Sequence, residues 1–307
     1  MSASAVRVGV VEKNQGDYWD TVNAGWAHAA ARLGLAVRVT APEYEDLDEQ
    51  LALMREHLES GVDVLAFVAT DPDAFGPIVA EAQAAGVIVL TFDLDAPACG
   101  RTLFVGMQPG VEMGRAAGRL MLEHVRSGQK VLAQTGSTAA QGAVGKLRGF
   151  VETVSAAGVE VVVAESDGEN LERAARIAEA LLAQHPDAAG MYGVYGYHPA
   201  IQARAAEAAG RPGVAVIGFD MVPDTVAELQ RGTVRASIWI RDYYFGYLAG
   251  VAAHDLAVLG GDEVLALYGM DPARPETTAR LLPITAYTPQ NVHEYVSWSE
   301  ARLNRQR

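Results

Sequence analysis

The chain has 307 residues, half of them hydrophobic, which is enough for a well-buried core and, at ordinary domain sizes, for two domains. Its 38 acidic and 24 basic residues give a net charge of −14 without a concentrated basic run, which disfavours nucleic acid and anionic membrane surfaces as partners. Its apolar runs fall short of the roughly 18 residues that a membrane-spanning helix needs, and a single cysteine, Cys99, excludes an internal disulfide.

The first third of the chain alternates apolar, β-branched runs with helical patterns. Strands are predicted at residues 6–11, 36–40, 62–68, 87–92 and 103–105, and helices at 22–33, 47–58 and 78–85. Such alternation with short, glycine-punctuated links is typical of right-handed βαβ units, so it predicts a parallel sheet.

The same alternation then begins again. Helices are predicted at residues 111–125, 144–156, 171–182, 200–208 and 225–230, and strands at 131–134, 159–164, 190–194, 214–219 and 236–240. Two runs of similar length indicate two similar α/β lobes. A long helix at 243–259, a strand at 282–286 and a helical tail opened by residues 288–291 have no obvious partner in the second lobe, so the chain is expected to cross back to the first.

Polar and aromatic side chains follow the predicted strands, at the edge where open parallel sheets bind their ligands. They are Glu12, Lys13, Tyr18 and Trp19 after the first strand, Asp93 and Asp95 after the fourth, and Gln141, Tyr195, Asp220 and Trp239 in the second lobe. Aromatic rings, carboxylates and amides suit a neutral polyhydroxy ligand. Each residue alone could belong to a turn or a core, so this interpretation depends on their recurrence at one end of successive strands.

Signals for an enzyme are poor. The sequence contains no Gly-x-Ser-x-Gly, P-loop, His-Glu-x-x-His or paired-cysteine motif. Of the seven histidines, only His198 follows a predicted strand, and the other six are expected at the surface. Asp93 and Asp95 leave one strand too close together to admit a sugar ring between them as a glycosidase pair would. We therefore expect a binding protein without a catalytic residue, cofactor or metal.

Short motifs along nearly the whole chain resemble those of the type I periplasmic binding proteins of ABC importers, in the ribose-, rhamnose- and autoinducer-2-binding group. The motifs are Tyr-Trp-Asp-Thr-Val-Asn-Ala-Gly at 18–25, Val-Leu-Thr-Phe-Asp at 89–93, Gly-Phe at 149–150, Val-Ile-Gly-Phe-Asp at 216–220, and Pro-Gln-Asn-Val with Glu-Tyr at 289–295. Lys13 ahead of Trp19, the pair Asp93 and Asp95 with Cys99 following, and Trp239 resemble the rhamnose and autoinducer-2 branch.

The resemblance implies two Rossmann-like lobes with parallel sheets and a ligand cleft between them, joined by a three-strand hinge near Gln108, Ile240 and Pro283. The lobes would be residues 1–107 plus 241–282 and residues 108–240 plus 283–307. A monomer would capture a small neutral sugar by hinge closure and deliver it to a membrane permease. By position, Tyr18 and Trp19 match the family's stacking aromatics, and Asp93 and Asp220 its sugar-binding acids.

Three departures from the ribose binders favour a less polar ligand, such as a deoxy-sugar or a small polyol. Val144 stands in place of a sugar-clamping arginine, Tyr195 in place of an asparagine and Ile240 in place of a glutamine. The ligand-sensing domain of a LacI-type regulator and a kinase-linked sensor remain alternatives, since both use this fold. The start of the chain lacks a basic and apolar leader, so a periplasmic or cell-surface location implies a leader already removed, and a native start implies the cytoplasm.

Overall fold

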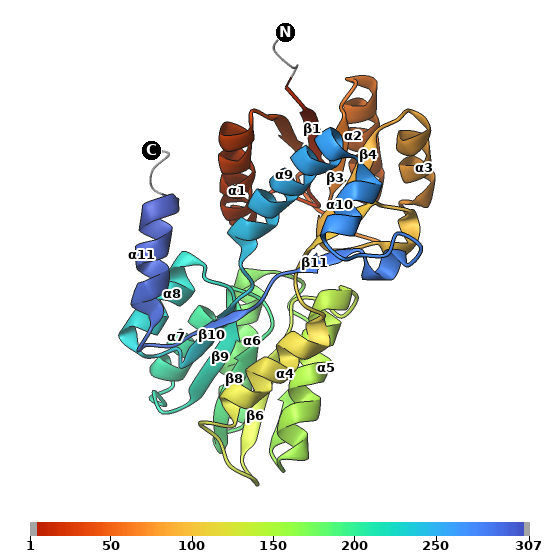
Figure 1. Cartoon of the computed structure of the whole chain (residues 1–307). Helices are drawn as coiled ribbons and strands as arrows, with labels where there is room; N and C mark the ends of the chain where they lie inside the picture. Colours follow the sequence, from red (N-terminus) through yellow and green to blue (C-terminus); the bar gives the residue numbers. More distant parts are fainter. Residues whose placement is uncertain (1–4, 304–307) are drawn as a thin grey trace. The chain divides into compact units, whose positions relative to one another are not determined.

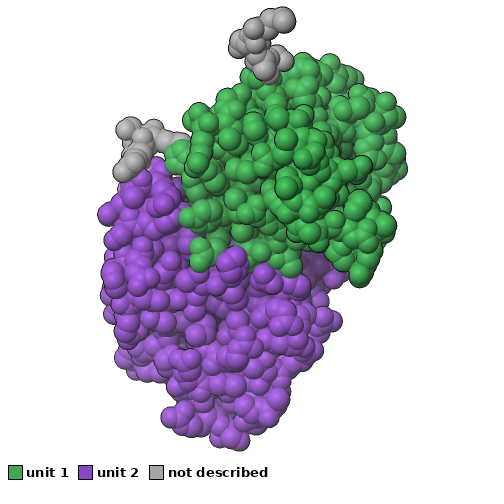
Figure 2. Space-filling model, viewed as in Figure 1, with its two compact units in different colours: residues 1–107, 241–282 green, residues 108–240, 283–307 purple. Residues whose placement is uncertain are grey.

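The computed structural model describes residues 5–303 (Figure 1). The chain divides into two compact units (Figure 2): unit 1 holds residues 1–107 and 241–282, and unit 2 holds residues 108–240 and 283–307. The chain therefore passes from one unit to the other three times, after Met107, Ile240 and Leu282. Neither unit is a continuous stretch of sequence.

Unit 1 is built on a six-stranded sheet in which every neighbouring pair is parallel. In spatial order its strands are β11 (Ala279–Leu281), β5 (Leu103–Gly106), β4 (Ile88–Asp93), β3 (Val64–Phe67), β1 (Arg7–Val11) and β2 (Ala36–Thr40). All four side chains of β3 are buried, as expected for a strand covered on both faces of a parallel sheet.

Two pairs of helices pack on this sheet, α1 with α9 and α2 with α3. The helical segments of unit 1 are α1 (Asp17–Leu33), α2 (Leu47–Glu59), α3 (Gly76–Ala84), η1 (Pro97–Cys99), α9 (Asp242–Leu259), α10 (Gly261–Leu267) and η2 (Pro275–Thr277). The connection from β1 to β2 runs in one direction along the sheet, and those from β2 to β3 and from β3 to β4 run in the other. Right-handed connections therefore place α1 on one face and α2 and α3 on the opposite face. Trp26 packs edge-on against Phe92 beneath α1, and Phe67 meets Phe75 beneath α3.

Unit 2 repeats this arrangement strand for strand. Its sheet runs β12 (Thr285–Tyr287), β10 (Ala236–Trp239), β9 (Ala215–Phe219), β8 (Ala188–Gly193), β6 (Lys130–Gln134) and β7 (Glu160–Val163), with only the edge strand β12 antiparallel. Its helices are α4 (Gly110–Met121), α5 (Gln141–Ala156), α6 (Leu171–Gln184), α7 (His198–Ala208), α8 (Pro223–Arg231) and α11 (Val292–Arg302). Strand β9 therefore occupies the place in unit 2 that β4 occupies in unit 1.

Glycines bring one helix pair in each unit into backbone contact. The pairs are α4 with α5 and α1 with α9, which lie side by side in Figure 1. In unit 2, a Cβ atom at Gly114 of α4 would overlap the carbonyl oxygen of Lys146 in α5, and a Cβ atom at Gly149 of α5 would overlap that of Val111. Gly25 and Gly246 stand in the same relation between α1 and α9 of unit 1. These helices lie too close together to admit any side chain at the crossing.

The predicted strands and helices agree with the structure to within a few residues, with three exceptions, and the expected exposure of one histidine is also wrong. Helix α1 begins at Asp17 rather than at residue 22, and α10 was not predicted. The single strand predicted at 282–286 is wrong: Pro283, which lacks an N–H donor, separates β11 from β12, and these belong to different sheets. His57 is fully buried against Thr40 rather than at the surface. Within residues 5–303, none of the helices is both long enough and apolar enough to cross a membrane.

Candidate functional site

Asp220 directly follows β9 in a backbone conformation that few residues adopt. Its φ of 64° lies in the left-handed region, where aspartate is tolerated better than most side chains. Strand β10 fixes this conformation on both sides, because the Asp220 N–H donates to the Ile238 carbonyl and its own carbonyl accepts from the Ser237 hydroxyl. Strained residues held in this way concentrate at functional sites.

One oxygen of the Asp220 carboxyl group makes no hydrogen bond to the described residues of unit 2. This oxygen, Oδ1, is buried and has no hydrogen-bond partner among any of the described residues. Burial raises the pKa of Asp220, and the positive charge of Lys146 acts in the opposite direction. Gly196 lies against the same carboxyl group, where a Cβ atom would approach Asp220 Cβ to 2.9 Å. A buried acceptor without a donor indicates a position that a ligand's donor could fill.

Lys146 lies beside Asp220 and is nearly buried, with 9% of its surface exposed. Its Nζ atom stands 4.4 Å from the centroid of the Phe219 ring, a cation–π contact that holds the ammonium group near the end of β9. Unit 2 thus places an acceptor and a donor next to each other at the carboxyl edge of its sheet.

Two tyrosines lie close to this edge. The half-buried rings of Tyr195 and Tyr197 are 5.8 Å apart, and Gly136, which follows β6, packs against both. Gln141, at the first turn of α5, is exposed. Trp239, the last residue of β10, packs instead among Tyr287, Tyr295 and Trp298.

His198 is the one histidine that the sequence places after a strand, and it anchors a loop. Its Nδ1 accepts the Tyr195 N–H at 3.0 Å and its Nε2 lies 2.7 Å from Asp167 Oδ2. Although burial acts in the opposite direction, hydrogen bonds from His198 and Tyr197 lower the pKa of Asp167, while burial lowers that of His198. With both ring nitrogens engaged, this imidazole has no nitrogen left for general acid–base chemistry.

Asp93 ends β4 in unit 1 as Asp220 follows β9 in unit 2. Its φ of 63° nearly equals that of Asp220, and its carboxylate accepts the Tyr18 hydroxyl at 2.8 Å. Trp19 is buried, with its indole N–H donating to Asn14 and its ring edge-on to Tyr18 and Phe92. Lys13 pairs with Glu45 at 2.9 Å.

Asp95, two residues beyond Asp93, is fully engaged within unit 1. Both of its oxygens accept from the Arg101 guanidinium at 2.6 Å, and Oδ1 also accepts from Thr91 and from the Ala96 N–H. Arg101, which has no exposed side-chain surface, also donates to Thr278. These contacts favour a structural role for Asp95.

We expect Asp95→Asn to lower the free energy of unfolding by about 3 kcal/mol, because it leaves a buried guanidinium without its counter-charge. Urea unfolding measures the loss, and calorimetry should show unchanged sugar affinity. The exposed pair of Arg38 and Glu56 is the matched control: Glu56→Gln should change stability by less than about 1 kcal/mol. A loss of sugar affinity in Asp95→Asn with intact stability would instead place this carboxylate at the ligand.

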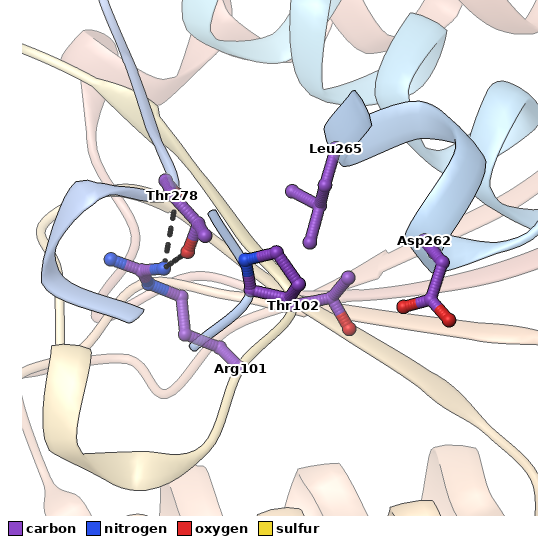
Figure 3. Close-up of a pocket in the computed structure, with 7 residues that line it drawn as sticks. Arg101, Thr102, Asp262, Leu265 and Thr278 are labelled. Carbon is purple, nitrogen blue, oxygen red and sulfur yellow. Dashed lines mark hydrogen bonds between the residues drawn. The ribbon is translucent and has the colours of Figure 1, made fainter. Parts of the chain in front are cut away.

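A cavity of about 240 Å³ lies elsewhere in unit 1 (Figure 3). Its lining includes Arg101, Thr102, Asp262, Leu265 and Thr278, with the Leu265 side chain pointing into it from α10. Thr102 and Thr278 directly precede β5 and β11, so the cavity lies at the amino ends of these strands. Asp93 pairs with Gly106 at the other end of β5, so this cavity is separate from the residues described above.

A model of the periplasmic binding protein domain matches residues 8–262, which is most of the chain. The chain belongs to the periplasmic binding protein family. The D-ribose/D-allose-binding protein of Pseudomonas aeruginosa is 29% identical over 201 residues, which cover 62% of this chain and 62% of that relative, just under two thirds of its length.

Two further relatives of this periplasmic binding protein match more of its length. The ribose import binding protein of Escherichia coli K12 is 27% identical over 223 residues, covering 73% of this chain and 74% of the relative. The solved structure of GanP, a glucose-galactose binding protein from Geobacillus stearothermophilus, has a TM-score of 0.78 at 25% identity and covers 94% of this chain and 99% of its own. The expected two-lobe α/β fold is confirmed, as is the expectation of a binding protein rather than an enzyme.

The structure of this periplasmic binding protein places Lys146 and Glu12 at the sheet edges more distinctly than the sequence pattern indicates. Val144 was compared with the ribose binders' arginine, but it is 37% exposed, and the cation beside Asp220 is Lys146, two residues further along α5. Lys146 stands four residues before Phe150 of the Gly-Phe motif, and this spacing is the sequence signal that could have identified it as a site residue. Glu12 belongs to the strand-end pattern, but its burial and its unpartnered oxygen, Oε1, are visible only in the structure.

Proposed function

We propose that this chain binds a small neutral sugar or sugar-like molecule through the residues at the carboxyl edges of its two sheets. The observation that carries the proposal is the buried, unpartnered Oδ1 of Asp220, held in a left-handed conformation. Asp93 in unit 1 has the same backbone conformation at the equivalent strand. The names of the ribose-, allose- and glucose-galactose-binding relatives support a carbohydrate ligand.

The chemistry of the edge in unit 2 fits a hydroxylated and partly apolar ligand. Sugar hydroxyls donate to carboxylates and accept from ammonium groups, so Asp220 and Lys146 can bind two neighbouring hydroxyls. The adjacent Tyr195 and Tyr197 rings offer apolar faces to sugar C–H groups. This mixture favours a monosaccharide with an apolar patch, such as a deoxy-sugar, or a small polyol.

The biological role that we propose is delivery of this ligand to an ABC transporter permease from the periplasm or the cell surface. In this proposal one ligand contacts residues of both units, and their closure around it selects the ligand-bound form. Asp93, Tyr18, Trp19 and Lys13 would act from unit 1, and Asp220, Lys146 and Tyr195 from unit 2. Family membership and the ribose import relative support this role.

A thermal-shift screen followed by calorimetry tests the proposed function. The panel contains D-ribose, D-allose, D-arabinose, L-rhamnose and a four-carbon polyol, with glutamate as the charged control. We expect at least one neutral compound at about 1,000 times its Kd to raise Tm by several degrees, because such binding stabilises the folded state by about 4 kcal/mol. A shift with glutamate alone would contradict the proposal.

A further inference from the structure

Glu12 is a buried acid with an unfilled hydrogen-bonding position. It directly follows β1, at the same edge of the unit 1 sheet as Asp93, and only 3% of its surface is exposed. Its Oε2 accepts a long hydrogen bond of 3.5 Å from Asn23 Nδ2. Neither Glu12 Oε1 nor Asn23 Oδ1 has a partner within the described part of the chain, although both atoms are buried.

Among the described residues, two acids and one amide act on the Glu12 carboxyl group. Asp20 and Asn23 approach from α1, and Asp93 approaches from β4. From α2, Gln50 donates to the main-chain carbonyl of Glu12 rather than to its carboxyl group. The neighbouring Lys13 pairs with Glu45.

These surroundings favour the neutral form of the acid. Burial raises the pKa of Glu12 to about 8, opposed by the Asn23 hydrogen bond and reinforced by the negative charges of Asp93 and Asp20. A neutral carboxyl group carries an O–H donor that a carboxylate lacks. At neutral pH, therefore, the edge of unit 1 presents an acid that can donate next to Asp93, which accepts.

We propose that Glu12 is a specificity-determining residue of the ligand site: its neutral carboxyl group donates to an oxygen of an uncharged ligand, and its ionisation beside Asp93 weakens binding. This inference depends on the proposed sugar-binding function. It is independent of Asp220 and Lys146, which lie in the other unit. The inference predicts that ligand affinity falls at alkaline pH, which would not happen at a site formed only from acids that are already ionised.

The test uses whichever of D-ribose, D-allose, D-arabinose, L-rhamnose and the four-carbon polyol binds most tightly at pH 7, and measures its affinity by calorimetry between pH 6 and pH 9.5. If only neutral Glu12 binds, affinity should fall about 30-fold between neutral pH and pH 9.5. Glu12→Gln keeps a donor and cannot ionise, so its affinity should stay nearly constant. Glu43→Gln makes the same change at an exposed position of unit 1 and should keep the pH dependence of the parent protein.

A readout without ligand accompanies the binding data. Because folding raises the pKa of Glu12 from 4.5 to about 8, its ionisation destabilises the folded state, and stability should fall as pH rises through this range. The Tm of Glu12→Gln should therefore increasingly exceed that of the parent protein between pH 6 and about pH 8, and the difference should level off above that. Binding of that compound with equal pH dependence in both proteins would overturn the inference and leave the proposed function intact. Failure of every neutral compound in the panel to bind would overturn both.

Discussion

Replacing Asp220 with asparagine is expected to weaken sugar binding 10- to 100-fold while leaving the protein at least as stable as before. A hydrogen bond to a charged acceptor contributes about 1.5–3 kcal/mol, which corresponds to this range of affinity. Asparagine has nearly the same shape and also tolerates the left-handed conformation at φ 64°, so the backbone should not change. Calorimetry with the tightest-binding sugar of the panel measures the loss.

The expected gain in stability separates a binding residue from a structural one. Burial raises the pKa of Asp220 above its ordinary value of 3.8, so the ionised side chain destabilises the folded state at pH values above that range. Asparagine removes this effect, and its Tm at pH 7 should be equal to or higher than that of the parent protein. Asp224→Asn, an exposed change on α8 in the same unit, should alter neither affinity nor stability by much. Unaltered affinity in Asp220→Asn would refute the assignment of this site.

Replacing Gly149 with alanine is expected to lower the free energy of unfolding by about 3 kcal/mol or more. The new methyl group would overlap the carbonyl oxygen of Val111, which is backbone and cannot rotate away, so α4 and α5 must separate. Urea unfolding monitored by circular dichroism measures the change.

Gly142, seven residues earlier in the same helix, is the matched control for this prediction. A Cβ atom there would meet nothing within 4 Å, so Gly142→Ala should leave stability unchanged or raise it by up to about 1 kcal/mol through helix propensity. Equal destabilisation by the two alanines would show that helix propensity or local strain, rather than the helix crossing, sets the effect at Gly149.

The fold could be predicted from the sequence because its signals are local and repeated. Runs such as residues 87–92 and 214–219 are almost continuously apolar and rich in β-branched residues, as expected for strands covered on both faces. The prediction failed at residues 282–286, which have a strand-like composition. Pro283 interrupts the run, and the chain passes there from unit 1 to unit 2, which the composition does not reveal.

The candidate site could be predicted only in part. Asp93 and Asp220 follow strands, so topology alone places them at a binding edge, but their shared left-handed conformation is visible only in the structure. Lys146 lies on helix α5, outside the strand-end pattern, and its ammonium group contacts the Phe219 ring at the end of β9. Asp95 satisfies the pattern equally well, yet its pairing with Arg101 depends on how residues 95–101 turn, which spacing does not reveal.

The discontinuity of unit 1 has a consequence for biosynthesis. Helix α1 needs α9 as its packing partner, and β5 has β11 as its outer neighbour, yet more than a hundred residues of the other unit are translated in between. Unit 1 therefore cannot be completed until residues 241–282 are available, and the face of α1 that packs against α9 stays uncovered until then. Chaperone dependence should be greatest during this interval, since exposed apolar surface is what makes partly folded chains aggregate.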